Sequence, residues 1–420
     1  MPKFATLDQE PTLSAKLKVI GVGGGGCNAI ESMMKRGLSG VEYVAINTDA
    51  QVLATSNANH KIQIGTGLTK GLGAGADPNV GRKALEEDRD KITKILNNSD
   101  MVFITAGMGG GTGTGAAPIV AAIAQSIGAL VIGIVTKPFK WEGKKRMLNA
   151  EEGISEMRQY VDSLIVIPNE RILNVLEDSA GAFTAFDKPN EVLHEATRGI
   201  ADIITIEGQI NVDFADVRSV MNHSGEALMG CGISSGENRA EEAAQKAISS
   251  PLLEGISIKG AKNILLNVTA SSNLTMKEIN DGNQVIYDAA GEEANIIFGL
   301  VQKEEMNEYV SYTVIATGFN ADSGFGKSVQ SNEKENKKPK VEKDSFLDNF
   351  DLGNAFEVDE NADLEVPTFK RMGGNLNLFG DNNKQNGFNF ESRISKPSKE
   401  VTEDDDSSDF LRMMMLLPVL

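Results

Sequence analysis

The sequence has little of several features that would point to other classes of protein. Its 420 residues include only two cysteines, Cys27 and Cys231, which excludes a disulfide framework and a cysteine-based zinc site and fits a reducing compartment. No apolar run approaches the roughly 18 residues that a membrane span needs. Residues 1–12 also lack the apolar core of a signal peptide. We therefore expect a soluble intracellular protein.

Basic residues are also scarce relative to acidic ones. The chain has 41 Lys and Arg against 59 Asp and Glu, a formal net charge of −18. The stretch from Asn320 to Leu420 has 20 acidic and 13 basic residues, so the tail and the rest of the chain are both acidic. Sequence-independent binding of nucleic acid needs a basic surface that displaces counterions. This balance argues against nucleic acid as a partner.

Glycine is the residue that the chain has in abundance, with 43 glycines against 12 prolines. Glycine at this density is typical of turns and of places where the backbone approaches a ligand closely. The 40% of apolar residues and 24% of charged residues are ordinary for a globular protein and permit a sizeable core. At about 150 residues per domain, the length predicts two or three domains.

Short apolar runs alternate with segments of helical periodicity from residue 15 to about Ile204. The expected strands are Lys18–Val22, Val41–Ile46, Met101–Thr105, Ala129–Val135 and Leu164–Pro168. The expected helices are Asn28–Arg36, Val80–Leu96, Pro118–Ser126 and Arg146–Tyr160. Strands that are apolar on both faces and separated by helices are typical of a parallel sheet covered on both sides. We predict a doubly wound, mostly parallel α/β domain.

The pattern changes in the following part of the chain. A long helix is expected at Asn190–Thr205, and another helix after Asp213. The next expected elements are Glu241–Ser249, Asn263–Ala270, Met276–Asp288, Asn295–Val301 and Tyr309–Phe319. Strand signals outnumber crossovers here, which predicts a smaller α+β domain. Beyond Phe319, segments such as Ser323–Lys343 are polar and charged, which indicates a disordered linker.

A glycine-rich loop follows the first expected strand and opens the first expected helix. Gly21, Gly23 and Gly26 satisfy the pattern G-x-G-x-x-G. The absent side chains let backbone N–H groups approach a phosphate, and the helix N-terminus adds partial positive charge. This loop alone favours a nucleotide, most simply a dinucleotide, while a tight turn without a ligand remains the alternative.

A second glycine-rich loop, Gly107–Gly115, follows the strand Met101–Thr105 at another strand-to-helix junction. A dinucleotide fold uses one phosphate loop and an acidic residue ~20 residues further on. Two loops at adjacent strand ends can enclose a triphosphate from both sides, with threonine hydroxyls as added donors and two helix N-termini facing the anion. The second loop therefore favours a nucleoside triphosphate.

The segment Gly109–Gly115, GGGTGTG, resembles the signature loop of the tubulin/FtsZ GTPases. Other segments follow in the order of that family: GVGGGGCNAI, AINTDAQ, GLGAGADP, INVDFADV, GENRAEEAA, AISSPLLEG and TVIATGF. The resemblance covers the chain from Lys16 to Phe319. It implies a GTPase that polymerises head to tail into filaments of the bacterial division ring, at the mid-cell division site in the cytoplasm, with GTP or GDP and Mg²⁺ as cofactors.

The resemblance also implies how the chain is divided. The implied parts are a flexible N-terminal segment (1–14), a GTP-binding domain (15–189), a connector of central helix and catalytic loop (190–217), an α+β domain (218–319), a linker (320–362), a docking peptide (363–371) and a disordered extension (372–420).

The residues implied to bind nucleotide fall into groups along the chain. They are Gly24, Gly25, Gly26, Cys27 and Asn28 in the first loop, Gly111, Thr112 and Gly113 on the phosphates, Glu142 and Arg146 on the ribose, Phe186 stacked on guanine and Asn190 on its edge. The loops with Asn47, Asp49, Ala74 and Gly75 are implied to line the phosphate and metal side. Taken without the resemblance, the preferred interpretation of Glu142 and Arg146 is a surface pair at i,i+4, and that of Phe186 is a core residue.

Asp213 and Asp216 form the most informative polar cluster, because they lie three residues apart at an expected helix start. Helix capping is one explanation for aspartates at such a place. The resemblance implies instead that this loop completes the nucleotide site of the next subunit, where the two carboxylates orient the attacking water and Asn211 supports them. The helix Asn190–Thr205 would then connect nucleotide and loop, and we take its role as transmitter as a hypothesis.

The tail contains a segment, Asp363–Arg371, that resembles the family's C-terminal peptide, which docks on membrane tethers and regulators. A chance match in a low-complexity tail is the alternative. The chain then ends in the apolar run Met413–Leu420, too short to span a bilayer. Three explanations for this end remain open: a second docking peptide, a weak membrane contact, or a terminus altered by a sequence error.

Two other functions remain as alternatives. One is a dinucleotide-dependent α/β enzyme such as a dehydrogenase, which would leave Gly109–Gly115 without a role. The other is a non-hydrolysing tubulin-like scaffold, which would need neither Asp213 nor Asp216.

Overall fold

The computed structural model describes residues 15–173, 181–206, 208–210, 212–253 and 258–319. The predicted N-terminal segment, Asn211, the linker, the docking peptide Asp363–Arg371 and the extension lie outside the described residues. Within the described ranges, no helix is both long and apolar enough to cross a membrane.

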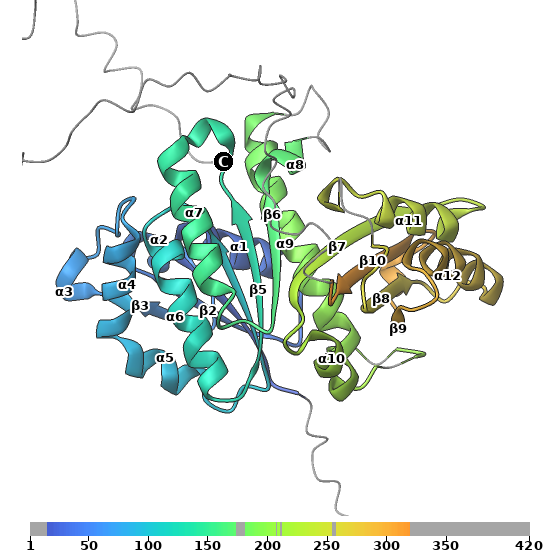
Figure 1. The fold of residues 1–420 in the computed structure, drawn as a ribbon, viewed down its shortest axis with the longest axis horizontal. Coiled ribbons are helices and arrows are strands. Elements are labelled where there is room, and N and C mark those ends of the chain that lie inside the picture. Colours follow the sequence, from blue (N-terminus) through green and yellow to red (C-terminus); the bar gives the residue numbers. More distant parts are fainter. Residues whose placement is uncertain (1–14, 174–180, 207, 211, 254–257, 320–420) are drawn as a thin grey trace, which may run out of the picture. The chain divides into compact units, whose positions relative to one another are not determined.

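One ten-stranded sheet runs through the described part of the chain (Figure 1), in the order β3-β2-β1-β4-β5-β6-β7-β10-β8-β9. Its strands are β1 (Leu17–Val22), β2 (Glu42–Asn47), β3 (His60–Gln63), β4 (Met101–Gly107), β5 (Leu130–Lys137), β6 (Ser163–Pro168), β7 (Gly225–Ser234), β8 (Asn263–Ala270), β9 (Asn295–Gln302) and β10 (Val310–Thr317). All pairs from β3 to β7 are parallel, β10 is antiparallel to both β7 and β8, and β9 returns parallel to β8.

Helices cover both faces of this sheet. The α-helices are α1 (Gly23–Lys35), α2 (Ala50–Thr55), α3 (Thr66–Thr69), α4 (Pro78–Glu87), α5 (Arg89–Leu96), α6 (Thr112–Ser126), α7 (Lys144–Met157), α8 (Asn169–Leu173), α9 (Ala182–Thr205), α10 (Phe214–Met221), α11 (Arg239–Ile248) and α12 (Met276–Ala290). The described residues also include three short 3₁₀ turns, η1 (Lys140–Glu142) between β5 and α7, η2 (Pro251–Leu253) between α11 and β8, and η3 (Glu304–Met306) between β9 and β10.

Neighbouring residues of the parallel strands enter different cores. Val19 packs with α1 and α9 on one face of the sheet, whereas Ile20 packs with α4, α5, α6 and α7 on the other. Phe103 and Ile104 of β4 divide in the same way. Burial on both faces explains why these strands are continuously apolar, and the doubly wound, mostly parallel α/β prediction is confirmed.

Helix α9 packs against both the parallel half of the sheet (β1 to β6) and its antiparallel half (β7 to β10) (Figure 1). Its side chains Leu193 and Ile200 share a core with Ile315 of β10. Gly199 makes this approach possible, because a Cβ there would lie 2.6 Å from the Cγ2 of Thr313. The other face of the antiparallel strands is covered by α11 and α12. The two halves thus share one sheet, and the domain boundaries given above stay predictions.

Several elements differ from the sequence prediction. The expected helix Val80–Leu96 is two helices that meet at Asp88, and the long helix begins at Ala182 rather than Asn190, with Pro189 inside it. Strands β3 and β7 were not predicted. β3 has only four residues, and β7 contains Gly230 and Gly232, where a Cβ would lie 2.0 Å from carbonyl oxygens of α11. Glycine is required at these two positions because α11 packs closely against them, and strand propensity does not explain it.

Candidate nucleotide-binding site

A cavity of about 970 Å³ lies where the parallel strands β1, β4, β5 and β6 end. Ligands of open α/β sheets bind in this position, outside the carboxyl ends of the strands. The predicted residues that line it are Gly24, Gly25, Asn28, Gly75, Gly111, Thr112, Gly113, Glu142, Arg146, Phe186 and Asn190. The structure therefore brings most of the predicted nucleotide contacts into one cavity.

The two glycine loops pack directly on each other. A Cβ on Gly23, whose φ is +72°, would lie 2.7 Å from the backbone N of Gly113. A Cβ on Gly25 of the first loop would lie 3.1 Å from the backbone N of Gly107 in the second. Only residues without side chains permit two loops to approach this closely. The glycines thus hold the two loops together as one wall of the cavity.

Two helices begin at this wall. Helix α1 starts at Gly23 and α6 at Thr112, so both N-termini lie beside the cavity. Nothing lies within 4 Å of where a Cβ would stand on Gly24 or Gly110. The unpaired N–H groups of helix N-termini and the positive end of the helix dipole favour an anion such as phosphate. The hydroxyls of Thr48 and Thr112 lie 2.7 Å apart and fix the start of α6 on the loop after β2.

An aromatic wall forms the other end of the cavity. The rings of Phe139 and Trp141 are stacked with centroids 5.4 Å apart, and both meet the ring of Phe186 edge-on at 6.1 Å. Phe186 is 55% exposed and Trp141 66% exposed. Phe186 is therefore not the core residue that its sequence alone also permitted, and its ring is available to a planar base.

Glu142 and Arg146 form an ion pair on the cavity wall. Arg146 NH1 donates to Glu142 Oε2 at 2.6 Å, and the backbone N of Phe139 donates to Glu142 Oε1 at 2.9 Å. Glu142 and Arg146 thus form the i,i+4 ion pair and also line the cavity, so the surface-pair explanation and the nucleotide-site explanation are compatible. Glu142 is fixed by two donors and can present its remaining lone pairs to hydroxyl groups.

Asn190 is oriented by a neighbour on its own helix. Its Nδ2 donates to Asp187 Oδ1 at 3.3 Å, and Arg36 NH2 donates to Asp187 Oδ2 at 3.2 Å. Because a carboxylate only accepts, the amide nitrogen of Asn190 must face Asp187. The amide oxygen is then free to accept from donors on a base.

Sequence reasoning missed Asn169, which lines the cavity directly after β6. Its Oδ1 is buried without a hydrogen-bond partner in the described structure. Buried polar atoms without partners are rare in folded proteins, and a ligand is one explanation for them. The signal was present in the sequence, because a polar residue at the carboxyl end of a parallel strand is placed to meet a ligand. Trp141, Thr136 and Leu193 were missed as well.

Other predicted residues lie behind the wall rather than on it. Gly26 packs under the loop, where a Cβ would lie 2.4 Å from the carbonyl oxygen of Thr105. Cys27 is 3% exposed, and its burial raises the pKa of its thiol to about 12. Ala74 is also absent from the cavity lining. The side chain of Cys27 is therefore a neutral part of the core.

The candidate metal side contains few free ligands. Asp49 caps α2, since its Oδ1 accepts from the backbone N of Gln51 at 2.8 Å, and Asn47 Oδ1 accepts from the backbone N of Asp49 at 3.2 Å. The described residues hold no group of three or more His, Cys, Asp or Glu that could bind a metal ion.

Asp213 and Asp216 are not part of the cavity. The cavity contacts the beginning of α9 through Asn190, and the fifteen residues from there to Thr205 span about 22 Å of helix. Asp213 stands at the N-cap position of α10, but its side chain makes no capping bond. Both carboxylates are exposed and have no hydrogen bond or ion pair with the described part of the chain. Asp213 thus makes no capping hydrogen bond, although both aspartates stand at the start of α10, where the helix dipole favours negative charge. Asn211 lies outside the described residues.

Comparisons with known proteins agree with this architecture. Residues 16–177 match the GTPase domain of the tubulin/FtsZ family, and residues 225–320 match the C-terminal domain of the FtsZ family. A solved FtsZ dimer from M. jannaschii is 44% identical, with a TM-score of 0.69 over 72% of this chain and 88% of that chain. A protofilament of CetZ2 from Haloferax volcanii with bound GTPγS is 19% identical, with a TM-score of 0.61 over 73% of this chain and 94% of that chain, and shows a similar fold.

Proposed function

The chain belongs to the tubulin/FtsZ family of GTPases, and on that premise we propose that it polymerises head to tail and hydrolyses GTP where two subunits meet. The observation that carries the proposal is the separation of Asp213 and Asp216 from the cavity along α9. The two carboxylates are exposed, have no partner among the described residues and lie beyond the end of α9 that is far from the nucleotide cavity. They can therefore act on a nucleotide only in a neighbouring molecule.

Two of the similar structures support self-association, since one is an FtsZ dimer and another a CetZ2 protofilament. A contact between two different surfaces of the same chain is heterologous, and when the rotation does not close it generates an open filament. The cavity end of one subunit would meet the α10 end of the next. The same contact would then build the polymer and complete the active site.

In this arrangement the two glycine loops and the starts of α1 and α6 hold the triphosphate. Glu142 and Arg146 are placed for the ribose, Phe186 for the base plane and Asn190 for the base edge. When bound, Mg²⁺ neutralises charge on the phosphates. Asp213 and Asp216 of the adjoining subunit orient and polarise the attacking water, so that catalysis depends on positioning and electrostatics. Asn211 would support that loop.

We further propose that the filaments form the bacterial division ring at mid-cell, in the cytoplasm. The support is the family relation, together with the resemblance of Asp363–Arg371 to a peptide that docks on membrane tethers and regulators. The dinucleotide enzyme is no longer an alternative, because the family match accounts for both glycine loops. The non-hydrolysing scaffold is the alternative that an experiment must test.

The test measures GTP turnover against protein concentration with Mg²⁺, while polymer is pelleted in parallel. Turnover that is negligible at low concentration and rises with polymer supports a site shared between subunits. A constant rate per molecule down to high dilution would mean a self-contained site and would overturn the role of Asp213 and Asp216. GTP binding without turnover at any concentration would favour the scaffold.

A variant makes the test specific. Asp216→Ala should retain GTP binding and polymer formation but lower turnover per polymerised subunit by about 100-fold or more, because a water-orienting carboxylate is lost. Asp90→Ala is a matched control, since Asp90 is an exposed aspartate in the first turn of α5. Equal loss of GTP binding and turnover in Asp216→Ala would overturn the catalytic role proposed for Asp216.

A further inference from the structure

The last residue of β9 and the connection from it to β10, residues 302–309, contact both the loop that precedes α10 and ends at Asp213, which we call the acidic loop, and the α11–α12 side of the sheet. We call this segment the bracket. It contains the turn η3, and the backbone N of Lys303 donates to the carbonyl oxygen of Ala270 at the end of β8 at 2.8 Å. The bracket is therefore fixed to the sheet at its beginning.

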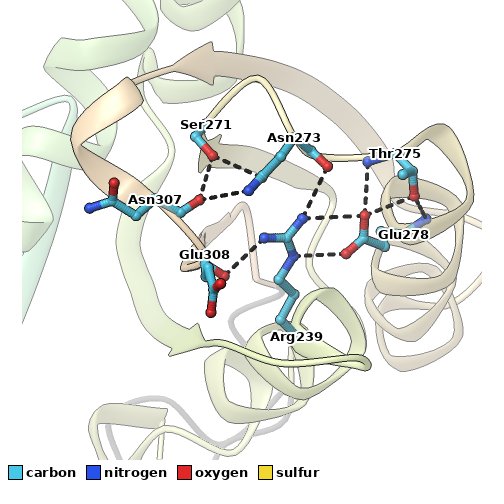
Figure 2. Close-up of polar contacts among 7 residues, drawn as sticks. All are labelled: Arg239, Ser271, Asn273, Thr275, Glu278, Asn307 and Glu308. Atoms are coloured by element: carbon cyan, nitrogen blue, oxygen red, sulfur yellow. Dashed lines mark hydrogen bonds and ion pairs between the residues drawn. The ribbon is translucent and has the colours of Figure 1, made fainter.

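A buried arginine fixes the other end of the bracket (Figure 2). Arg239 of α11 is 7% exposed, and its NH1 donates to the carbonyl oxygen of Glu308 at 2.9 Å. The same guanidinium donates through Nε to Glu278 Oε1 at 2.7 Å and through NH2 to the carbonyl oxygen of Asn273 at 3.2 Å. A planar guanidinium with several fixed donors is well suited to tie three segments together.

The same cluster holds the sharpest turn of the bracket. Asn307 has a φ of +51°, in the left-handed region that non-glycine residues seldom adopt. Figure 2 shows Ser271 and Asn273 converging on its carbonyl oxygen, to which Ser271 Oγ and Asn273 Nδ2 both donate, the latter at 3.0 Å. These bonds support a backbone conformation that would otherwise be unfavourable.

From this anchored position the bracket contacts the end of α9. Lys303 Nζ lies 2.6 Å from Asp202 Oδ2, and Arg198 Nε donates to the same oxygen at 3.0 Å. Asp202 is 2% exposed, so its charge is held by these two cations inside the protein. A buried carboxylate that loses a partner carries a large desolvation cost. The contact therefore holds Lys303 and Asp202 at a fixed position relative to each other.

Strand β9 and the bracket also hold the acidic loop itself. The backbone N of Leu300 donates to the carbonyl oxygen of Ile210 at 3.1 Å, and Gln209 Nε2 donates to Gln302 Oε1 at 3.3 Å. The side chain of Val212, 7% exposed, lies against β9 at Gly299, where a Cβ would be 3.4 Å from Val212 Cγ2. The residue after Val212 is Asp213, so the loop lies on β9 immediately before its exposed carboxylate.

We propose that Lys303 is a positioning residue for GTP hydrolysis, which sets the place of Asp213 and Asp216 by tying the β9 support of the acidic loop to the end of α9. The proposal rests on the proposed function of that loop. Lys303 does not touch the nucleotide of its own chain. It acts through Asp202 on one side and through β9 on the other, so that the loop is held in one register relative to the helix that reaches the cavity.

The test uses the full-length protein with Lys303→Met, which keeps the length of the side chain and removes its charge. The expected result is unchanged GTP affinity of the monomer, a small change in the concentration needed for polymer, and a fall of about tenfold in turnover per polymerised subunit, since a misplacement near 1 Å can cost more than this. Lys303→Arg should recover most of the turnover. Lys91→Met is the control, because Lys91 pairs with Asp88 at 2.7 Å on the surface of the α4–α5 junction.

Turnover per polymerised subunit equal to that of the wild type in Lys303→Met would overturn the positioning role, as would failure of Lys303→Arg to recover turnover. If Lys303→Met does not fold, Gln302→Ala decides the matter. It removes two exposed side-chain bonds, to Gln209 and to Glu304, and leaves the buried contact of Lys303 intact. It should lower turnover per polymerised subunit about twofold, and no change there would overturn the proposal. Failure of the proposed function is a separate result, namely a wild-type rate that does not depend on protein concentration.

Discussion

The buried amide oxygen of Asn169 differs from the other buried oxygens without partners among the described residues because it lies on the cavity wall and not in the core. Several buried oxygens lack partners in the described structure, among them those of Asn267 and Asn283, but only the one on Asn169 belongs to a cavity-lining residue in that set. An unpaired oxygen in a core lowers stability, whereas one on a cavity wall can be paired by a ligand.

Asn169→Ala is therefore expected to separate affinity from stability. Guanine nucleotide should bind about tenfold more weakly, since a hydrogen bond to a buried oxygen is lost. The free energy of unfolding without nucleotide should not fall, because the removed oxygen has no partner there. Calorimetric titration with GDP and urea unfolding measure the two quantities. Asn283→Ala in α12 is the control and should leave the affinity for GDP unchanged.

Single residues also show where sequence information was sufficient. The spacing of Glu142 and Arg146 predicted their ion pair, and the family resemblance placed them at a nucleotide cavity. The alternatives for Phe186 and Asp213 could be decided only with three-dimensional contacts, since core burial and capping depend on neighbours far away in the sequence. The place of Asn169 directly after a parallel strand was visible in the sequence, but the lack of a partner for its amide oxygen in the described structure is a property of the folded wall that no local pattern reveals.

At the scale of elements, α9 was predicted too short because proline usually precedes or ends a helix. Pro189 lies inside α9, and the turns before it carry Phe186 to the cavity wall. Strand β7 was missed for a related reason. Its glycines have low strand propensity, and their role is to let α11 approach, which periodicity does not reveal.

Helix α9 also carries a buried histidine, His194, which is 2% exposed and whose Nδ1 has no partner within the described structure. Burial lowers its pKa to about 4, with further lowering by the nearby charges of Arg198, Arg36 and Lys303 and an opposing effect of Asp202. The unfolded chain takes up this proton near pH 6.5 and the folded chain only near pH 4. Stability contributed by this group is therefore lost as pH falls through that interval.

Comparison with His194→Gln isolates this effect. The wild type should lose about 2 kcal/mol more of its free energy of unfolding than the variant between pH 7 and pH 5. Urea unfolding at a series of pH values measures the difference. Parallel pH profiles for the two proteins would show that His194 titrates normally in the folded state.

At the scale of the whole molecule, a shared active site predicts that two defective variants repair each other. Asp216→Ala has an intact cavity and an impaired loop. Gly113→Ala has an intact loop and a damaged cavity, since its Cβ would lie 2.7 Å from the carbonyl oxygen of Gly107. In an equal mixture that copolymerises at random, about one junction in four joins an intact cavity to an intact loop.

The mixture should therefore reach about a quarter of the wild-type turnover per polymerised subunit, with both variants present in the pellet. Turnover equal to the mean of the two separate variants, despite copolymerisation, would contradict a site built from two chains. The contact between chains could not be predicted from composition or periodicity. The sequence showed only two aspartates three residues apart at an expected helix start, and their lack of a partner in the described part of the chain came from the structure.

The length of α9 has a consequence for any filament built in this way. The helix has 24 residues, and its part from Asn190 at the cavity to Thr205 extends about 22 Å toward the acidic loop. If each loop meets the cavity of the next subunit, the translation from one subunit to the next must cover that extent. The length of this helix would then set a lower limit for the axial period of the polymer, which its layer lines measure and which should exceed about 22 Å.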